Sequence, residues 1–128
     1  DVADWHDYAA AKPDPAPGEL TTLQGMQLLD DLAEFKVPAV LFSGGEPLQR
    51  RDCLTLMDYA VGRDLRVSLS TNGTLITDET ARRLKRIGVQ YAGISIDGAP
   101  EKNDRMRGVA GAFEASIAGI QRCQDAGV

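Results

Sequence analysis

Short apolar segments and helix-forming segments alternate along most of this 128-residue chain, and each apolar segment ends at a turn that contains glycine. The first such segment reads VPAVLFS and ends at a double glycine. A run of this kind is too short for a helix and rich in strand-forming residues, so it predicts a buried strand. Strands that alternate with helices predict βαβ units, in which right-handed helical crossovers join parallel strands. The sequence therefore predicts an α/β fold with a parallel sheet.

The alternation also sets the expected order of the elements. Apolar residues at helical spacing predict helices, and the short apolar runs between them predict strands. The expected helices are 22–36, 52–63, 78–87 and 112–126, and the expected strands are 37–43, 65–70 and 90–96. Residues 22–128 thus read α-β-α-β-α-β-α. A proline-rich loop is expected over residues 9–20.

A parallel sheet of three strands has two unpaired edges, which expose backbone hydrogen-bonding groups to other chains. We therefore expect residues 1–128 to be a fragment of a larger sheet, cut at both ends. The open edges also predict self-association, or pairing with the missing part of the sheet. In α/β folds ligands bind at the loops that follow the carboxyl ends of the strands, so a site is expected there.

Charge and composition exclude several classes of protein. The net charge of −5 argues against a nucleic-acid partner, because phosphate backbones are bound by clustered Lys and Arg. No apolar run approaches the ~20 residues of a membrane-spanning helix, and the acidic start differs from a signal peptide. A cytoplasmic protein without a membrane partner is expected. Cys53 and Cys123 are far apart and lie in expected helices, which predicts free structural thiols.

Small and polar residues gather in the turns after the expected strands. Gly44 and Gly45 would let backbone N–H groups approach a ligand closely, and Glu46 would place an anion where an ammonium group can be held. Serine and Asp side chains after the next two strands suit a ribose or a carboxylate. Taken singly, these turns also fit tight strand-to-helix connections, with Glu46 solvated and the other side chains capping helices. The two interpretations stay open on these residues alone.

In this order and spacing, the turns resemble the radical S-adenosylmethionine (SAM) superfamily, from about residue 4 to the end. The motifs that carry the resemblance are GGEP, STNG and SIDG after the three expected strands, and NDRMR at 103–107 leading to GAF at 111–113. The resemblance implies a partial (βα)6 radical SAM barrel, of which this chain would be about half. The segments VPAVLFSGGEPL, LSTNGTLI and YAGISIDG are most similar to the branch that synthesises heme d1 and related modified tetrapyrroles.

The resemblance implies roles for the matching residues. Gly44, Gly45 and Glu46 would hold the methionyl amino group of SAM, and Pro47 would fix the turn. The remaining cofactor-binding residues that it implies are Ser70 and Asn72 beneath the cofactor, Ser95 and Asp97 facing its ribose or carboxylate, and Arg107 paired with its carboxylate. No residue receives a catalytic role.

The sequence departs from the family pattern in two places. Asn103 stands where relatives often have His. The family also holds a [4Fe-4S] cluster with CxxxCxxC followed by an aromatic residue; with Tyr8 as that aromatic, Asp4 and Asp7 take the second and third cysteine positions. Residues 1–21 would then be the remnant of the cluster-binding loop. Thiolate sulfur holds iron–sulfur clusters and carboxylate oxygen does not, so no cluster is expected here, whether the Asp pair is engineered or natural.

The resemblance implies a function for the parent protein, a [4Fe-4S]-dependent radical SAM enzyme acting on a tetrapyrrole in heme d1 biosynthesis. Residues 1–128 are expected to be its partial SAM-binding core, inactive without the cluster and with weak or lost affinity for SAM. The alternatives are a fragment of a SPASM-type peptide-modifying maturase and a non-catalytic folding or self-association module.

Overall fold

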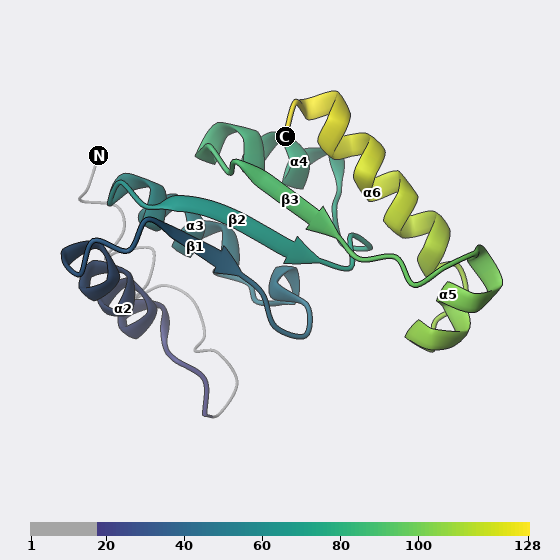
Figure 1. The fold of residues 1–128 in the computed structure, drawn as a ribbon, viewed down its shortest axis with the longest axis horizontal. Helices are drawn as coiled ribbons and strands as arrows, with labels where there is room; N and C mark the ends of the chain where they lie inside the picture. The colour runs from purple at the N-terminus through teal and green to yellow at the C-terminus, as the bar shows by residue number, and fades with distance from the viewer. Residues whose placement is uncertain (1–17) are drawn as a thin grey trace.

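The computed structural model describes residues 18–128, and within them the chain forms one parallel sheet with helices packed on it. Its three strands, β1 (Ala39–Phe42), β2 (Arg66–Thr71) and β3 (Tyr91–Ile94), lie side by side in that order (Figure 1). The helices are α2 (Thr22–Glu34), α3 (Cys53–Gly62), α4 (Asp78–Ile87), α5 (Pro100–Arg107) and α6 (Ala112–Ala126), with a 3-10 helix, η1 (Pro47–Gln49), after β1. The prediction of an α/β fold built of parallel βα units is confirmed.

Helix α4 has the predicted bounds because its sequence carries signals at both ends. The Thr77 side chain accepts a hydrogen bond from the backbone N–H of Thr80, which satisfies one of the free donors at the helix start. The first turn is acidic and the last turn basic, which suits the helix dipole. Gly88 ends the helix in the left-handed region, at φ 89°, where glycine is favoured.

Helix α6 also has its predicted bounds, whereas the ends of several other elements differ from the predicted ones by one or two residues. Helix α2 ends at Glu34 rather than at residue 36, because Lys36 adopts the left-handed conformation, at φ 62°, and turns the chain toward β1. Strand β1 begins after Pro38, which has no N–H group to donate to a ladder. Strand β3 ends at Ile94, two residues before the predicted end. The three strands therefore form a small sheet, and long connections follow their carboxyl ends.

Helix α5 is an element that the sequence pattern did not predict. The expected helices and strands leave residues 97–111 outside any element, but Pro100–Arg107 is helical. Proline at its first turn costs no hydrogen bond, and Gly108 ends it in the left-handed region. Asn103 is its buried residue, so the helix has no apolar stripe that periodicity detects. The segment before α6 is thus an ordered helix that holds Arg107 at its last turn.

The core lies on one face of the sheet. Val67 and Leu69 of β2 are fully buried against Met57 of α3 and Leu84 of α4, and α3 and α4 lie behind the sheet in Figure 1. The side chains that point the other way along β2 are exposed or half-buried. No helix among residues 18–128 is long and apolar enough to cross a bilayer.

Candidate functional site

The turn after β1 opens the candidate site. Gly44 has φ 140°, a conformation that side-chain-bearing residues rarely adopt, and a Cβ at Gly44 or Gly45 would meet no atom within 4 Å. The backbone of both glycines therefore borders open space. Pro47 is buried at the first position of η1, where its ring fixes φ and restricts the turn.

Glu46 joins the carboxyl ends of β1 and β2. Its Oε1 accepts hydrogen bonds from the backbone N–H of Leu48, at 3.0 Å, and from the hydroxyl of Thr71, at 2.7 Å. Its Oε2 accepts from the backbone N–H of Asn72 at 2.8 Å. The solvated Glu46 of the alternative interpretation is wrong, because this half-buried carboxylate crosslinks two strand ends.

The turn after β2 is packed tightly under α6. The side-chain oxygen of Asn72 accepts hydrogen bonds from the backbone and the hydroxyl of Thr74, while its backbone carbonyl accepts from the hydroxyl of Ser116 at 2.7 Å. A Cβ added at Gly119 of α6 would clash with the carbonyl oxygen of Gly73. The Asn72 side chain therefore has a structural role in an Asx turn, and helix α6 fixes the position of that turn.

An ion pair lies beyond the end of β3. Arg107 Nε is 2.7 Å from Asp97 Oδ2, and the Arg107 guanidinium also donates to the carbonyl of Ser95 at 3.3 Å. The backbone N–H of Asp97 donates to the side-chain oxygen of Asn103, which is 1% exposed. Three residues that the sequence linked to SAM, namely Ser95, Asp97 and Arg107, are thus in one contact network.

Asp104 organises the start of helix α6. Its carboxylate accepts hydrogen bonds from the backbone N–H groups of Phe113, at 2.8 Å, and Gly111, at 2.6 Å. These two bonds lower the pKa of Asp104 below its ordinary value. Sequence reasoning missed this residue, as it missed Thr71 and Ser116, because their partners are many positions away in the chain. One signal in the sequence was available: Gly111 is the N-cap of α6 and has no side chain, so another residue has to accept hydrogen bonds from the first N–H groups of the helix.

A cavity of about 240 Å³ opens between the β2 turn and the start of α6. Two of the predicted cofactor-binding residues, Asn72 and Arg107, line it together with Thr74 and Ala112. The predicted residues of the β1 turn do not line it, and neither do Ser70, Ser95 and Asp97. Ser70 is half-buried and Ser95 exposed. The candidate site is therefore an open surface at the carboxyl ends of the strands, with one cavity next to α6.

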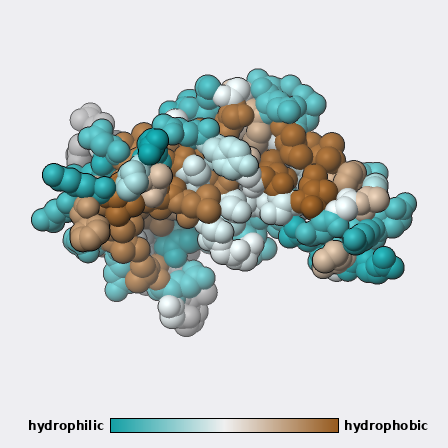
Figure 2. Space-filling model, viewed as in Figure 1, coloured by the Kyte–Doolittle hydropathy of each residue, from teal (hydrophilic) through white to brown (hydrophobic). Residues whose placement is uncertain are grey.

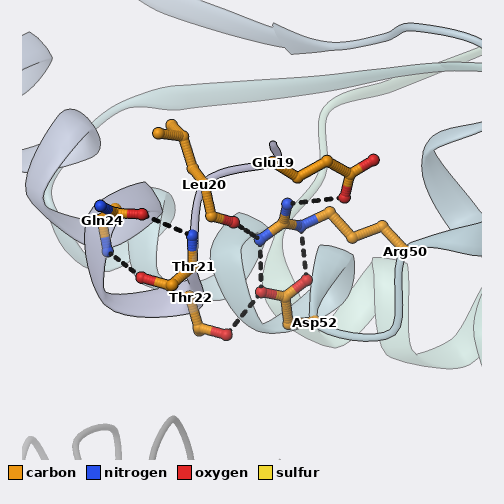
Figure 3. A network of polar contacts seen from close by, with 7 residues as sticks. All are labelled: Glu19, Leu20, Thr21, Thr22, Gln24, Arg50 and Asp52. Atoms are coloured by element: carbon orange, nitrogen blue, oxygen red, sulfur yellow. Dashed lines mark hydrogen bonds and ion pairs between the residues drawn. The ribbon is translucent and has the colours of Figure 1, made fainter. Parts of the chain in front are cut away.

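A partly buried ion pair fixes the loop after β1 to the start of α2 (Figure 3). Arg50 contacts both carboxylate oxygens of Asp52, at 2.6 and 2.8 Å, and also donates to the carbonyl of Leu20. Asp52 accepts a further bond from the hydroxyl of Thr22. Burial raises the pKa of Asp52, but the bonds from Arg50 and Thr22 outweigh it and leave the pKa below its ordinary value. This network anchors the Glu46 turn to the helical layer.

Among residues 18–128, no three His, Cys, Asp or Glu side chains gather as a metal site. Cys53 is buried in α3, where burial and the nearby charge of Asp52 raise its pKa to about 12; burial also raises the pKa of Cys123 in α6. Both thiols therefore stay protonated near neutral pH, as expected of structural cysteines. Asp4 and Asp7, at the positions of the family's cluster cysteines, lie outside the described residues.

Comparison with protein families decides the membership of the chain. The model of the Radical SAM superfamily matches residues 6–128. The chain belongs to the radical SAM superfamily. Its three parallel strands and their helices therefore cover part of a radical SAM domain, and the strand-end loops described above are the loops of such a domain.

Curated relatives include proteins of heme and related tetrapyrrole synthesis. The chain is 48% identical to the Fe-coproporphyrin III synthase of Methanosarcina barkeri and 44% identical to the pre-heme d1 synthase of Dinoroseobacter shibae, each over 123 residues. These alignments cover 96% of the chain and 31% and 30% of the two relatives. Mycofactocin maturase MftC of Mycobacterium tuberculosis is 41% identical over 112 residues, which are 87% of the chain and 28% of that protein. The radical SAM chain thus spans about a third of the length of these relatives.

Proposed function

We propose that the chain is the SAM-binding core of a radical SAM enzyme of tetrapyrrole biosynthesis. Its strand-end turns bind SAM in the way that the family resemblance implies. The observation that carries the proposal is the Glu46 crosslink, because it holds a carboxylate in place at the edge where parallel sheets bind ligands.

Glu46 has the capacity to bind the methionyl ammonium group of SAM. An ionised carboxylate offers about four lone-pair positions, and three are used by Leu48, Thr71 and Asn72. The three bonds orient the carboxylate before any ligand arrives, so binding loses little side-chain freedom. The bare backbone of Gly44 leaves room for the ligand to approach.

Arg107 supplies the opposite charge. A guanidinium has five N–H donors, and its contacts with Asp97 and Ser95 leave donors for the carboxylate of SAM. Asp97 keeps one oxygen for a ribose hydroxyl while the other pairs with Arg107. An anion at Glu46 and a cation at Arg107 match the two charges at the amino-acid end of SAM.

The residues of this chain do not fit an iron–sulfur cluster. A bound cluster would supply the electron that radical chemistry on SAM needs. Cluster binding requires a set of thiolates, whereas the sequence has two cysteines and both are buried thiols with raised pKa. We therefore propose that the chain binds SAM weakly and does not cleave it.

The proposed substrate class is a tetrapyrrole. The relatives named as Fe-coproporphyrin III and pre-heme d1 synthases support it, since they align with more of the chain and at higher identity than the mycofactocin maturase does. A peptide substrate is the second candidate, and the maturase similarity supports it.

Titration calorimetry with SAM tests the proposed site. Glu46→Gln removes the charge that holds the ammonium and should weaken SAM binding about tenfold, as the loss of a charge-assisted bond implies. Arg107→Lys keeps the charge but loses the planar fork, and should weaken binding by a smaller factor. Arg82→Ala, on the exposed face of α4, is the matched control and should leave binding unchanged.

Equal SAM affinity in Glu46→Gln, Arg107→Lys and the unmodified chain would contradict the site. Circular dichroism establishes that each variant is folded; Arg107 is exposed, so its replacement serves as the test if Glu46→Gln does not fold.

The proposed inactivity has its own test. Incubation with SAM and dithionite under anaerobic conditions should give no 5′-deoxyadenosine, and its formation would show that the chain acquires a cluster.

A further inference from the structure

The face of the sheet opposite the helices carries small polar residues. Ser68 and Ser70 of β2 point to this face, since Val67, Leu69 and Thr71 alternate with them and are buried on the helix side. Strand pairing sets Ser70 beside Gly93 of β3. In Figure 2, which looks at this face, a pale and weakly polar region lies between two brown apolar ones.

Such residues cannot fill the inside of a barrel. The interior of a packed (βα) barrel is filled by bulky branched side chains in layers. Here Ser43 follows the pair Phe42–Leu69 and therefore continues the row of Ser70 and Gly93. Serine and glycine have small side chains, so this row fills little of the inner face at the strand ends that Glu46 joins.

The ring of Tyr91 lies next to this row. It belongs to the same face of β3 as Gly93 and is 63% exposed. A Cβ added at Gly93 would lie 3.0 Å from ring atom Cε1 and 3.4 Å from the hydroxyl oxygen of Tyr91. The ring therefore leans over Gly93 toward the carboxyl end of the strand, and it depends on the absence of a side chain at that position.

The direction of the lean connects Tyr91 to the proposed site. Tyr91 is four residues before Ser95, about 13 Å along an extended strand, and the ring shortens this gap. Leu41 of β1, in the row of Ser68 and Tyr91, is 57% exposed and adds apolar area on the far side. An exposed aromatic ring and a leucine on either side of serine hydroxyls suit a flat, largely apolar ligand with polar groups on its rim.

We propose that Tyr91 is a specificity-determining residue that packs its ring against the tetrapyrrole macrocycle, with Gly93 providing the room for the ring. This inference rests on the proposed function, because it takes the substrate class from there. Tyr91 contributes stacking area and positions the macrocycle below SAM, and its phenol takes no part in proton transfer.

The test is a titration of the chain with Fe-coproporphyrin III, followed by the Soret band in the presence of SAM. Tyr91→Ala should raise Kd about tenfold through loss of stacking and contact area. Tyr91→Phe retains the ring and should stay within about twofold of the unmodified chain. Gly93→Ala displaces the ring and should fall between the two. Phe35→Ala removes an aromatic side chain that is 84% exposed elsewhere, and is the matched control.

A second measurement uses the unmodified chain and does not depend on the folding of a variant. Tetranitromethane should nitrate Tyr91, and saturating Fe-coproporphyrin III should protect it, as read by mass spectrometry of the peptide that contains it. Unchanged nitration at saturation overturns the inference. Equal losses of affinity in Tyr91→Ala and Phe35→Ala also overturn it, because they indicate non-specific adsorption. A chain that binds SAM but no tetrapyrrole overturns this inference and leaves the SAM site standing; a chain that binds neither overturns both.

Discussion

The two faces of the sheet have opposite chemistry. On the helix side, Val67 and Leu69 are fully buried in an apolar core with Met57 and Leu84. On the other side, the same strand presents serines to an open surface. Alternation along one strand therefore places the side chains that stabilise the fold on one face and the side chains that are available to a ligand on the other. Substitutions on the two faces should have different consequences, which the following predictions use.

The largest expected effect is in the helix-side core. Leu69→Ala removes a fully buried side chain and should lower the free energy of unfolding by about 2–5 kcal/mol. Ser68→Ala, one residue earlier on the opposite face, should change it by less than about 0.5 kcal/mol. Urea denaturation followed by circular dichroism measures both. Comparable losses would mean that the two faces do not differ in the way described.

The Arg50–Asp52 pair tests the anchoring of the Glu46 turn to the helical side. Asp52→Asn removes the charge of the buried Asp52 carboxylate from its pair with Arg50. It should lower the free energy of unfolding by about 1.5–3 kcal/mol near neutral pH. The pKa of Asp52 is lower in the folded chain than its ordinary value. The pair therefore stabilises the fold above that ordinary value, and the contribution is lost as the pH falls through the lowered pKa.

The corresponding pH measurement is a pair of urea curves for each protein, near neutral pH and at about pH 3. The difference in unfolding free energy between Asp52→Asn and the unmodified chain should shrink at the lower pH. A difference that is the same at both pH values would show that the Asp52 charge is not what the fold uses.

The contact of α6 with the Gly73 turn should tolerate no added atom. Gly119→Ala would place a Cβ against the Gly73 carbonyl, and the resulting shift should cost about 1–3 kcal/mol. Gly62→Ala is a matched control at the end of α3, where a Cβ meets nothing within 4 Å and alanine favours the helix. Thermal unfolding of the two variants should move in opposite directions. A stabilised Gly119→Ala would refute the close approach.

The smallest expected effect lies on the open face. Leu41 is more than half exposed, so Leu41→Ser should lower the free energy of unfolding by less than about 1 kcal/mol. The substitution also separates this face from the strand edges, whose unpaired backbone groups predict self-association. If copies of the chain meet through this face, sedimentation velocity should show less dimer for Leu41→Ser. An unchanged dimer fraction would assign any association to another surface, such as the strand edges.

The sequence predicted the fold well wherever local signals decide structure. The bounds of α4 and α6 follow from Thr77, Gly88 and Gly127, which act within one helical turn. Helix α5 was missed because a polar helix that buries only Asn103 has no hydrophobic period. Strand ends were less accurate because pairing with neighbours determines them.

In the candidate site, too, local features could be predicted from the sequence and long-range contacts could not. The turns at Gly44–Pro47 and at Asn72 were recognised from local motifs, and the structure brings them together. Their long-range partners were not predictable, because the bonds of Glu46 to Thr71 and of Ser116 to Asn72 join residues 25 and 44 positions apart. The Asp97–Arg107 pair had both members named in advance, but as ligands of SAM rather than of each other.

The central claim is that the strand-end edge of the sheet, and no other surface, binds SAM. Nuclear magnetic resonance of the 15N-labelled chain tests it directly, because each backbone amide reports its own surroundings. Titration with SAM should shift the amides of residues 44–46, 72–74, 95–97 and 107, and leave those of α3 and the inner part of α4 unchanged. Saturable shifts that cluster elsewhere, or no shifts at millimolar SAM, would contradict the account.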